Sequence, residues 1–123
     1  MEVVRATGLA ARLGTEARHL SHGEKQSLEL AMVLALEPSL LLLDEPTAGL
    51  TAAERARIGT LLVDLAERYR LCIVLVEHDL AFVRRISSRV IVLHQGSIVL
   101  DGGVEDAVAS ETVRTIYAGA AHG

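Results

Sequence analysis

The sequence predicts an α/β fold in which parallel strands with flanking helices are followed by a C-terminal hairpin. Two apolar runs, residues 40–43 and 71–76, each end in polar residues, as strands buried on both faces of a parallel sheet do. The amphipathic stretch between them, residues 52–68, has the length of a crossover helix. A strand, a helix and a strand of these lengths form a βαβ unit with a right-handed crossover.

The composition of the 123 residues indicates one globular domain in a reducing compartment. Half of the chain is apolar, and the net charge of −4 offers no electrostatic case for binding nucleic acid or anionic lipid. The single cysteine, Cys72, excludes an internal disulfide and is expected to be an inert packed thiol. No apolar window is long enough to span a bilayer, so we expect no direct membrane insertion.

The first third of the chain is expected to be helical. Residues 2–13 predict a short helix with its larger apolar side chains inward. Ser21, followed by Glu24 three residues later, forms a capping box that begins a helix running to about Glu37. Because that stretch is apolar nearly all round, we expect a buried helix.

The remaining elements follow from local signals. Thr51 and Glu54 make a second capping box, which opens the crossover helix with one apolar stripe. Asp79 is expected to cap a short helix. Two strands joined by a turn and then two short helices complete the chain (residues 90–93, 97–100, 104–109 and 111–117).

Acidic residues and a histidine follow the two predicted parallel strands. Because the carboxyl ends of parallel strands lie on one edge of a sheet, we expect Asp44, Glu45 and His78 to lie together. Asp44 is suited to hold a hydrated Mg²⁺, and Glu45 to orient or deprotonate a water. The alternative is that the two acids only cap a loop and that the histidine is an ordinary loop residue.

The start of the first long helix is a candidate anion site. A cap at Ser21, a flexible Gly23 and free backbone N–H groups suit a phosphate. An ordinary capped helix is the alternative interpretation. His19 and His22 are three residues apart with no cysteine nearby, so we do not expect a metal site there.

Four motifs in this order resemble the second half of an ATP-binding cassette (ABC) ATPase. They resemble its signature motif, Walker B strand, D-loop and H-switch (residues 20–26, 40–46, 47–51 and 76–79). Within the family, Ser-His-Gly-Glu, Ala-Gly-Leu-Thr and Glu-His-Asp look most like the ATPase subunits of branched-chain amino acid or urea importers. The resemblance implies a partial P-loop NTPase core, with the end of the helical subdomain in residues 1–37 and the Walker B and H-switch core, hairpin and last helices in residues 38–123.

The resemblance also implies a role for each site residue, with ATP and Mg²⁺ as cofactors. Asp44 would position Mg²⁺, Glu45 would be the general base and His78 would sense the γ-phosphate. The expected contacts with ATP held by the opposite subunit of a dimer come from the signature motif and the D-loop (Ser21, His22, Gly23, Glu24, Gly49 and Thr51). Two positions depart from the commonest family pattern: His22 replaces a glycine, and Thr51 replaces the D-loop aspartate.

The 123 residues contain no Gly-x-x-x-x-Gly-Lys-Ser/Thr loop, and the sole lysine, Lys25, lies in the signature helix. In the family, the strand before that loop lies between the strands that correspond to residues 71–76 and 90–93. We therefore expect a gap in the sheet, with three possible outcomes: another chain fills it, the sheet closes up, or the isolated chain is unstable. The chain is not expected to hydrolyse ATP alone.

The resemblance favours the C-terminal part of an importer's ATP-binding subunit, for branched-chain amino acids or a similar small polar solute. It would lie in the cytoplasm at the inner face of the membrane, held by permease subunits. Its partner would be a second ABC ATPase subunit or a chain bearing Walker A. One alternative is a truncated, non-catalytic cassette that only associates. Another is an ABC ATPase of DNA maintenance, which the acidic balance and lack of heptads disfavour.

Overall fold

The computed structural model describes residues 2–120 of the chain. The chain divides into two compact units, Met1–Glu77 and His78–Gly123. The predicted family subdomains, residues 1–37 and 38–123, have a different boundary and stay a prediction.

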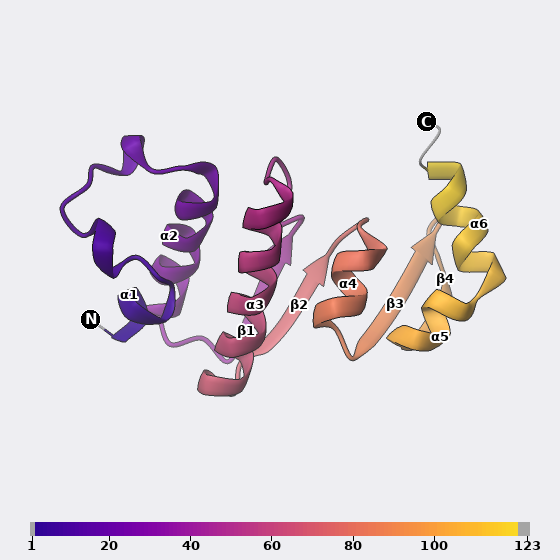
Figure 1. Cartoon of the computed structure of the whole chain (residues 1–123). Coiled ribbons are helices and arrows are strands. Elements are labelled where there is room, and N and C mark those ends of the chain that lie inside the picture. Colours follow the sequence, from indigo (N-terminus) through magenta and orange to yellow (C-terminus); the bar gives the residue numbers. More distant parts are fainter. Residues whose placement is uncertain (1, 121–123) are drawn as a thin grey trace. The chain divides into compact units, whose positions relative to one another are not determined.

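The first unit contains the predicted βαβ arrangement. Its strands β1 and β2 are parallel, with a register that runs from Leu40 opposite Cys72 to Asp44 opposite Val76. The helix α3 connects them along the chain, as Figure 1 shows. The elements of this unit, in order, are α1 (Glu2–Ala6), the 3-10 turns η1 (Ala10–Arg12) and η2 (Ala17–His19), α2 (His22–Leu34), β1 (Leu40–Asp44), α3 (Ala52–Tyr69) and β2 (Cys72–Val76).

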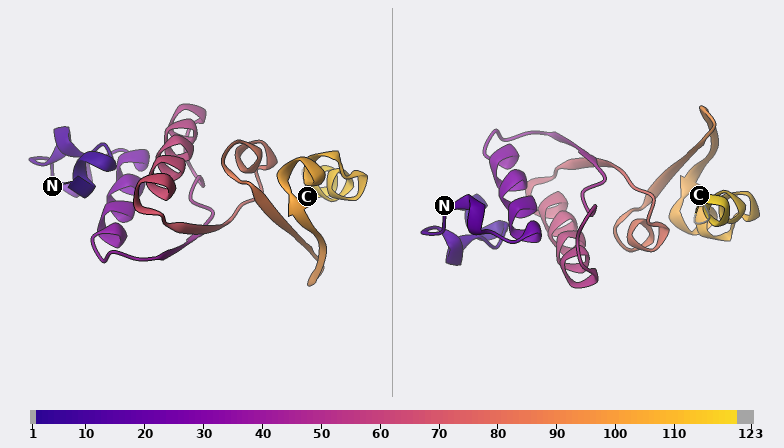
Figure 2. Two further views of the ribbon diagram at one scale, coloured as in Figure 1. Left: turned by 90° about the horizontal axis from the view of Figure 1, so that it is seen from below. Right: turned by 90° about the horizontal axis from the view of Figure 1, so that it is seen from above.

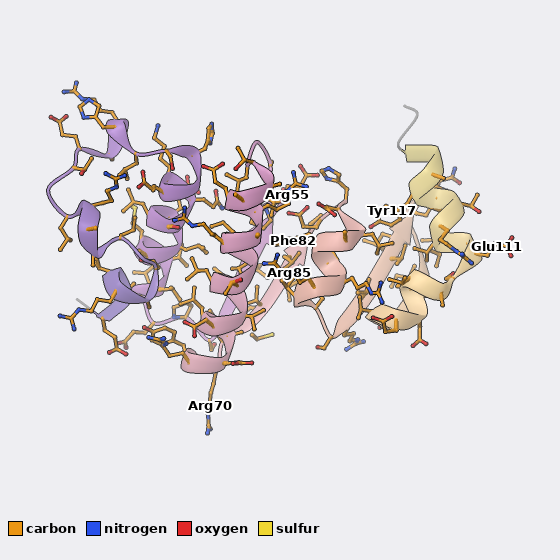
Figure 3. The ribbon with its side chains drawn as sticks, viewed as in Figure 1. Arg55, Arg70, Phe82, Arg85, Glu111 and Tyr117 are labelled. Carbon is orange, nitrogen blue, oxygen red and sulfur yellow. The ribbon has the colours of Figure 1, made fainter. Side chains whose placement is uncertain are left out.

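Both predicted capping boxes are confirmed, at the starts of α2 and α3. The predicted end of α2 near Glu37 is wrong, because the helix ends at Leu34. Glu37 has a φ of +53° and precedes Pro38, a position at which helical backbone is disfavoured. At the other end of the crossover, Arg70 terminates α3 with a φ of +49° and extends away from the helix (Figure 3).

The prediction of a single helix over residues 2–13 is wrong. Gly8, with a φ of +74°, separates α1 from η1. This left-handed conformation breaks the helical period, so the two leucines that follow have different environments. Leu9 is buried, whereas Leu13, which we expected to face inward, is 61% exposed.

Apolar side chains are exposed on one face of the β1–β2 pair, contrary to the prediction of strands buried on both faces. Leu42 is 69% exposed and its partner in the register, Val74, is 52% exposed. The preceding residue of β1, Leu41, is only 3% exposed, because its side chain points to the opposite face. Parallel sheets are normally covered on both faces, and the described residues cover one face of this pair.

Two further predictions of burial fail for the same reason. Cys72 begins β2 on the uncovered face and is exposed, so it is not a packed thiol. On α2, Met32 is 65% exposed, so this helix is not buried all round. Apolar composition indicates that a face can be covered, but not which elements cover it.

The second unit is a hairpin with helices. Its strands β3 and β4 pair antiparallel through the turn at Gln95 and Gly96, whose φ values of +47° and +77° match the twist of a hairpin. Figure 2 shows α5 and α6 on one side of this hairpin. The elements are α4 (Leu80–Ile86), β3 (Arg89–His94), β4 (Ser97–Gly103), α5 (Val104–Ala109) and α6 (Glu111–Ala120).

The core of the second unit lies between its hairpin and its last helices. Val92, Ala107 and Val113 are buried there. Tyr117 packs against them and is labelled on α6 in Figure 3. The outer face of the hairpin is apolar and exposed, with Leu93 at 68%.

The described strands form two separate two-stranded sheets, β1–β2 and β3–β4. The expected gap between residues 71–76 and 90–93 stays a prediction, because these two strands belong to different units. Each sheet keeps unpaired outer edges within the described residues, where backbone groups can accept another strand.

Candidate functional site

The two predicted acids lie at the carboxyl edge of the parallel pair. Asp44 is the last residue of β1 and lies opposite Val76. The N–H of Glu45 donates to the carbonyl oxygen of Val76 at 2.9 Å, which extends the ladder one residue beyond the strand. Both acidic side chains are exposed. Their oxygen donors suit Mg²⁺, which is typically held by one or two carboxylates together with water and phosphate.

The backbone of Glu45 adopts an uncommon conformation. Its φ is +46°, in the left-handed region that favours glycine. Such a residue costs about 1–3 kcal/mol and persists only where its surroundings determine it. The N–H of Ala48 donates to the carbonyl oxygen of Glu45 at 3.0 Å and closes the turn. The predicted general base thus stands on a strained but hydrogen-bonded turn.

The carboxylate of Glu77, the residue that follows β2, is hydrogen-bonded to the same turn. Oε1 of Glu77 accepts hydrogen bonds from the Oγ1 of Thr47 at 2.7 Å and from its N–H at 3.2 Å. Thr47 is only 6% exposed. Sequence reasoning missed both residues, treating them only as parts of motifs. The available signal was an acid just after one buried strand and a hydroxyl in the turn after its parallel neighbour.

His78 directly follows Glu77 and begins the second unit. Its side chain is exposed. The predicted approach of His78 to Asp44 and Glu45 stays a prediction. The cap predicted next to it is confirmed, because Asp79 accepts a hydrogen bond from the N–H of Phe82 at 3.0 Å.

The start of α2 is tied down by charged side chains. Ser21 Oγ accepts from the N–H of Glu24, whose carboxylate accepts from the N–H of Ser21 at 2.8 Å and from Nε of Arg12 at 2.6 Å. The hydrogen bond from the Ser21 backbone, followed by that from Arg12, lowers the pKa of Glu24. These bonds therefore hold the start of α2 to Arg12 and to its own capping residue.

A second carboxylate joins this start to the start of α3. Oε1 of Glu54 accepts from the N–H of Gly23 at 3.3 Å. The other oxygen accepts from the N–H and Oγ1 of Thr51, both at 3.0 Å, and the Thr51 backbone bond is the main cause that lowers the pKa of Glu54. The expectation of free N–H groups here is thus wrong for Gly23 and Glu24, whose N–H groups already have carboxylate and hydroxyl acceptors.

Most of the residues predicted to contact the nucleotide lie near the starts of α2 and α3. Glu54 connects the segment from Ser21 to Glu24 with Thr51, and His22 is exposed beside them. Gly49, with a φ of +74°, lies in the turn before Thr51, and the left-handed conformation accounts for glycine at that position. Whether these residues contact ATP stays a prediction.

Two negative findings concern the described residues alone. None of their helices is both long and apolar enough to cross a membrane. They also contain no group of three or more histidine, cysteine, aspartate or glutamate side chains arranged to hold a metal ion. A Mg²⁺ that Asp44 shares with water and phosphate does not require such a group.

Comparisons with known proteins show which family the chain resembles. A family model described as "ABC transporter" matches residues 1–48. The high-affinity branched-chain amino acid transport ATP-binding protein LivG of Salmonella typhimurium is 33% identical over 114 residues, which are 93% of this chain and 45% of that protein. The chain belongs to the ABC transporter ATPase family. The methionine import ATP-binding protein MetN of Bartonella henselae is 39% identical over 89% of this chain and 32% of its own length.

Solved ABC ATPases have the same fold as this chain. The cbiO1 structure from Clostridium perfringens, part of the ABC transporter complex cbiONQ, is 31% identical with a TM-score of 0.84, covering 94% of this chain and 46% of that one. The ADP conformation of the cassette MJ1267 gives a TM-score of 0.87 at 22% identity, over 96% of this chain and 48% of that one, and supports the fold alone. The predicted fold class is confirmed. The chain spans less than half the length of these relatives.

Proposed function

We propose that this chain supplies the Walker B strand, signature helix and H-switch of an ATP-hydrolysing subunit of an ABC importer. The observation that carries the proposal is the carboxyl edge of the β1–β2 pair. There Asp44 ends a strand and Glu45 begins a turn that is hydrogen-bonded to the neighbouring strand. Open α/β sheets bind their ligands at this edge.

Each residue then has a defined task. Asp44 holds Mg²⁺, which when bound neutralises charge on the phosphates of ATP. Glu45 accepts a proton from the attacking water, and His78 contacts the γ-phosphate. The α2 start, with Ser21 and Gly23, faces the nucleotide of the opposite subunit. For this contact, the phosphate competes with the Glu54 carboxylate for the N–H of Gly23.

The phosphate loop of the complete site comes from outside these 123 residues, which contain no such motif. It belongs either to a segment of the same polypeptide or to a separate chain. A second ATPase subunit and membrane permease subunits complete the assembly, which places the chain at the cytoplasmic face of the membrane. Because LivG is named for branched-chain amino acid transport and MetN for methionine import, we propose a small polar solute such as a branched-chain amino acid.

A second candidate is a chain that associates with a cassette without catalysing hydrolysis. The exposed apolar face that includes Leu42 and Val74 favours it, because such a surface suits a protein partner. A DNA-maintenance ATPase has no comparable support, since the net charge of −4 does not favour a polyanion.

Hydrolysis assays on the chain alone, and after mixing with a phosphate-loop segment encoded next to it, test the proposal. We expect no turnover alone, turnover in the mixture, and a loss of roughly a hundredfold or more with Glu45→Gln. Glu67→Gln, an exposed acid on α3, is the matched control and is expected to leave turnover unchanged. Hydrolysis by the chain alone that depends on Glu45 contradicts the need for a partner segment. A stable but inactive mixture favours the association-only candidate.

A further inference from the structure

The last residue of β2, Val76, and the residue after it, Glu77, are hydrogen-bonded to the turn that carries Glu45. Three hydrogen bonds connect them: one from the N–H of Glu45 to the Val76 carbonyl, and two from Thr47 to Oε1 of Glu77. The first continues the ladder of the strands. The other two are accepted by a side chain 30 residues away in sequence and hold the turn beyond the point where the ladder ends.

The conformation of Glu45 explains why extra bonds are needed. A non-glycine residue with a φ of +46° returns to more common backbone conformations unless its neighbours prevent it. The bond from Ala48 to the Glu45 carbonyl lies within the turn and leaves the turn able to move as a unit. Glu77 connects the turn to the end of β2, because it accepts both hydrogen bonds from Thr47, two positions after Glu45.

The environment of Glu77 is not that of a surface acid. Its hydrogen-bond donor residue, Thr47, is buried. The other carboxylate oxygen of Glu77, Oε2, is also buried and accepts no hydrogen bond within the described residues. A solvated glutamate keeps both oxygens in water, so this side chain gives up solvation to reach Thr47.

We propose that Glu77 is a positioning residue that holds Glu45 in the orientation needed to activate water. The inference rests on the proposed hydrolytic function for its kinetic consequence, whereas the contact itself is independent of that function. A small displacement of a reacting group costs a large part of the rate, because the group must lie in line with the bond that forms.

Amide hydrogen exchange of the intact chain, measured by NMR, tests the contact. Glu77→Ala is expected to speed exchange of the Thr47 amide by about tenfold or more, while amides in the middle of α3 stay unchanged. Glu77→Gln keeps an oxygen that accepts both bonds and is expected to restore protection to within about threefold of the parent chain. Glu67→Gln is the matched control.

A second variant tests the same contact in case Glu77→Ala does not fold. Thr47→Val keeps the buried volume and removes only the hydroxyl donor, and we expect exchange at the Thr47 position to increase by roughly threefold. Thr60→Val, which removes an exposed threonine hydroxyl on α3, is its control. Unchanged exchange in both Glu77→Ala and Thr47→Val overturns the positioning role.

Kinetics in the ATP-hydrolysing assembly test the consequence. Glu77→Ala is expected to lower kcat by about tenfold or more with KM for ATP within about twofold, and Glu77→Gln to restore kcat. An unchanged kcat despite faster exchange overturns the inference. If the parent assembly does not hydrolyse ATP, the proposed function fails, while the exchange experiment still decides whether Glu77 holds the turn.

Discussion

The two strand pairs of this chain differ in which charged residues lie at the ends of their strands. In the parallel pair, both carboxyl ends lie on one edge, so Asp44, which ends β1, and Glu77, which follows β2, both lie there. In the antiparallel pair, one strand begins where the other ends, and the outermost charged contact is the ion pair of Arg89 with Asp101. The acid of the hairpin, Asp101, therefore bonds within its own pair, whereas at the parallel edge Asp44 is exposed and Glu77 bonds the turn that follows β1.

The two strand pairs also differ in the segments that connect their strands and in the helices that pack on them. The hairpin forms through a two-residue turn and packs on the helices that follow it, with Ala107 and Val113 fully buried. The parallel pair requires the 18-residue crossover α3, which is capped at Thr51 and anchored by Leu65, fully buried. Each pair leaves one apolar face exposed, so apolar exposure does not separate the proposed catalytic edge of β1–β2 from the ends of the hairpin. Topology does.

The largest expected effect is on ATP hydrolysis, when one acid is replaced in each strand pair. Asp44→Asn is expected to lower ATP hydrolysis of the complete assembly by roughly a hundredfold or more, because the amide binds Mg²⁺ poorly. Asp101→Asn, on the hairpin, is expected to leave hydrolysis unchanged. Steady-state kinetics at varied Mg²⁺ check both variants. Equal losses would show that the parallel edge has no special role.

The second prediction compares the two cores. Leu65→Ala on α3 is expected to cost about 3 kcal/mol of unfolding free energy, and Val113→Ala on α6 about 2, since both side chains are fully buried. Urea denaturation followed by circular dichroism measures both. A cost below about 1 kcal/mol for Leu65→Ala would mean that the first unit does not depend on packing at the crossover helix.

The third prediction concerns the caps of the first unit. Ser21→Ala and Thr51→Ala each remove a side chain that accepts a hydrogen bond from the third residue of its helix, and each is expected to cost about 1 kcal/mol. Thr115→Ala, whose hydroxyl bonds a carbonyl within α6, is the control and is expected to cost less. Thermal melts of the three variants provide the comparison.

The smallest expected effect is a pH dependence. The pKa values of Glu24 and Glu54 are lowered in the folded chain, chiefly by backbone hydrogen bonds from Ser21 and Thr51. Their stabilisation is therefore fully present above the unfolded pKa, near 4.5, and is lost as the pH falls through the lower folded values. Melting temperatures between acid and neutral pH should show a shallower decline for Glu54→Gln than for the parent chain. An identical decline would contradict the assigned bonds.

Local sequence signals predicted the elements of this fold well. The capping boxes at Ser21 and Thr51 and the hairpin turn each depend on residues within a few positions of one another, and the βαβ order follows from the apolar pattern of three successive segments. The early end of α2 and the break at Gly8 were missed, although both have local causes, because competing apolar periodicity extended beyond them.

Burial and the details of the site were harder to predict. Exposure of Leu42 and Cys72 depends on which layers cover a sheet, and periodicity does not report that. The contacts from Glu77 to Thr47 and from Glu54 to Gly23 join residues 30 and 31 positions apart. Only the register of the parallel strands and the approach of two helices bring these side chains within reach, so tertiary structure determines them.

The close approach of Glu54 to Gly23 has a consequence for judging related sequences. A methyl group at position 23 would lie 3.1 Å from Cγ of Glu54, so alanine there would push on the side chain that also caps α3. The contact with Glu54 therefore favours glycine at this point independently of any contact with a nucleotide. A glycine at this position is therefore not by itself evidence that the helix start contacts a phosphate.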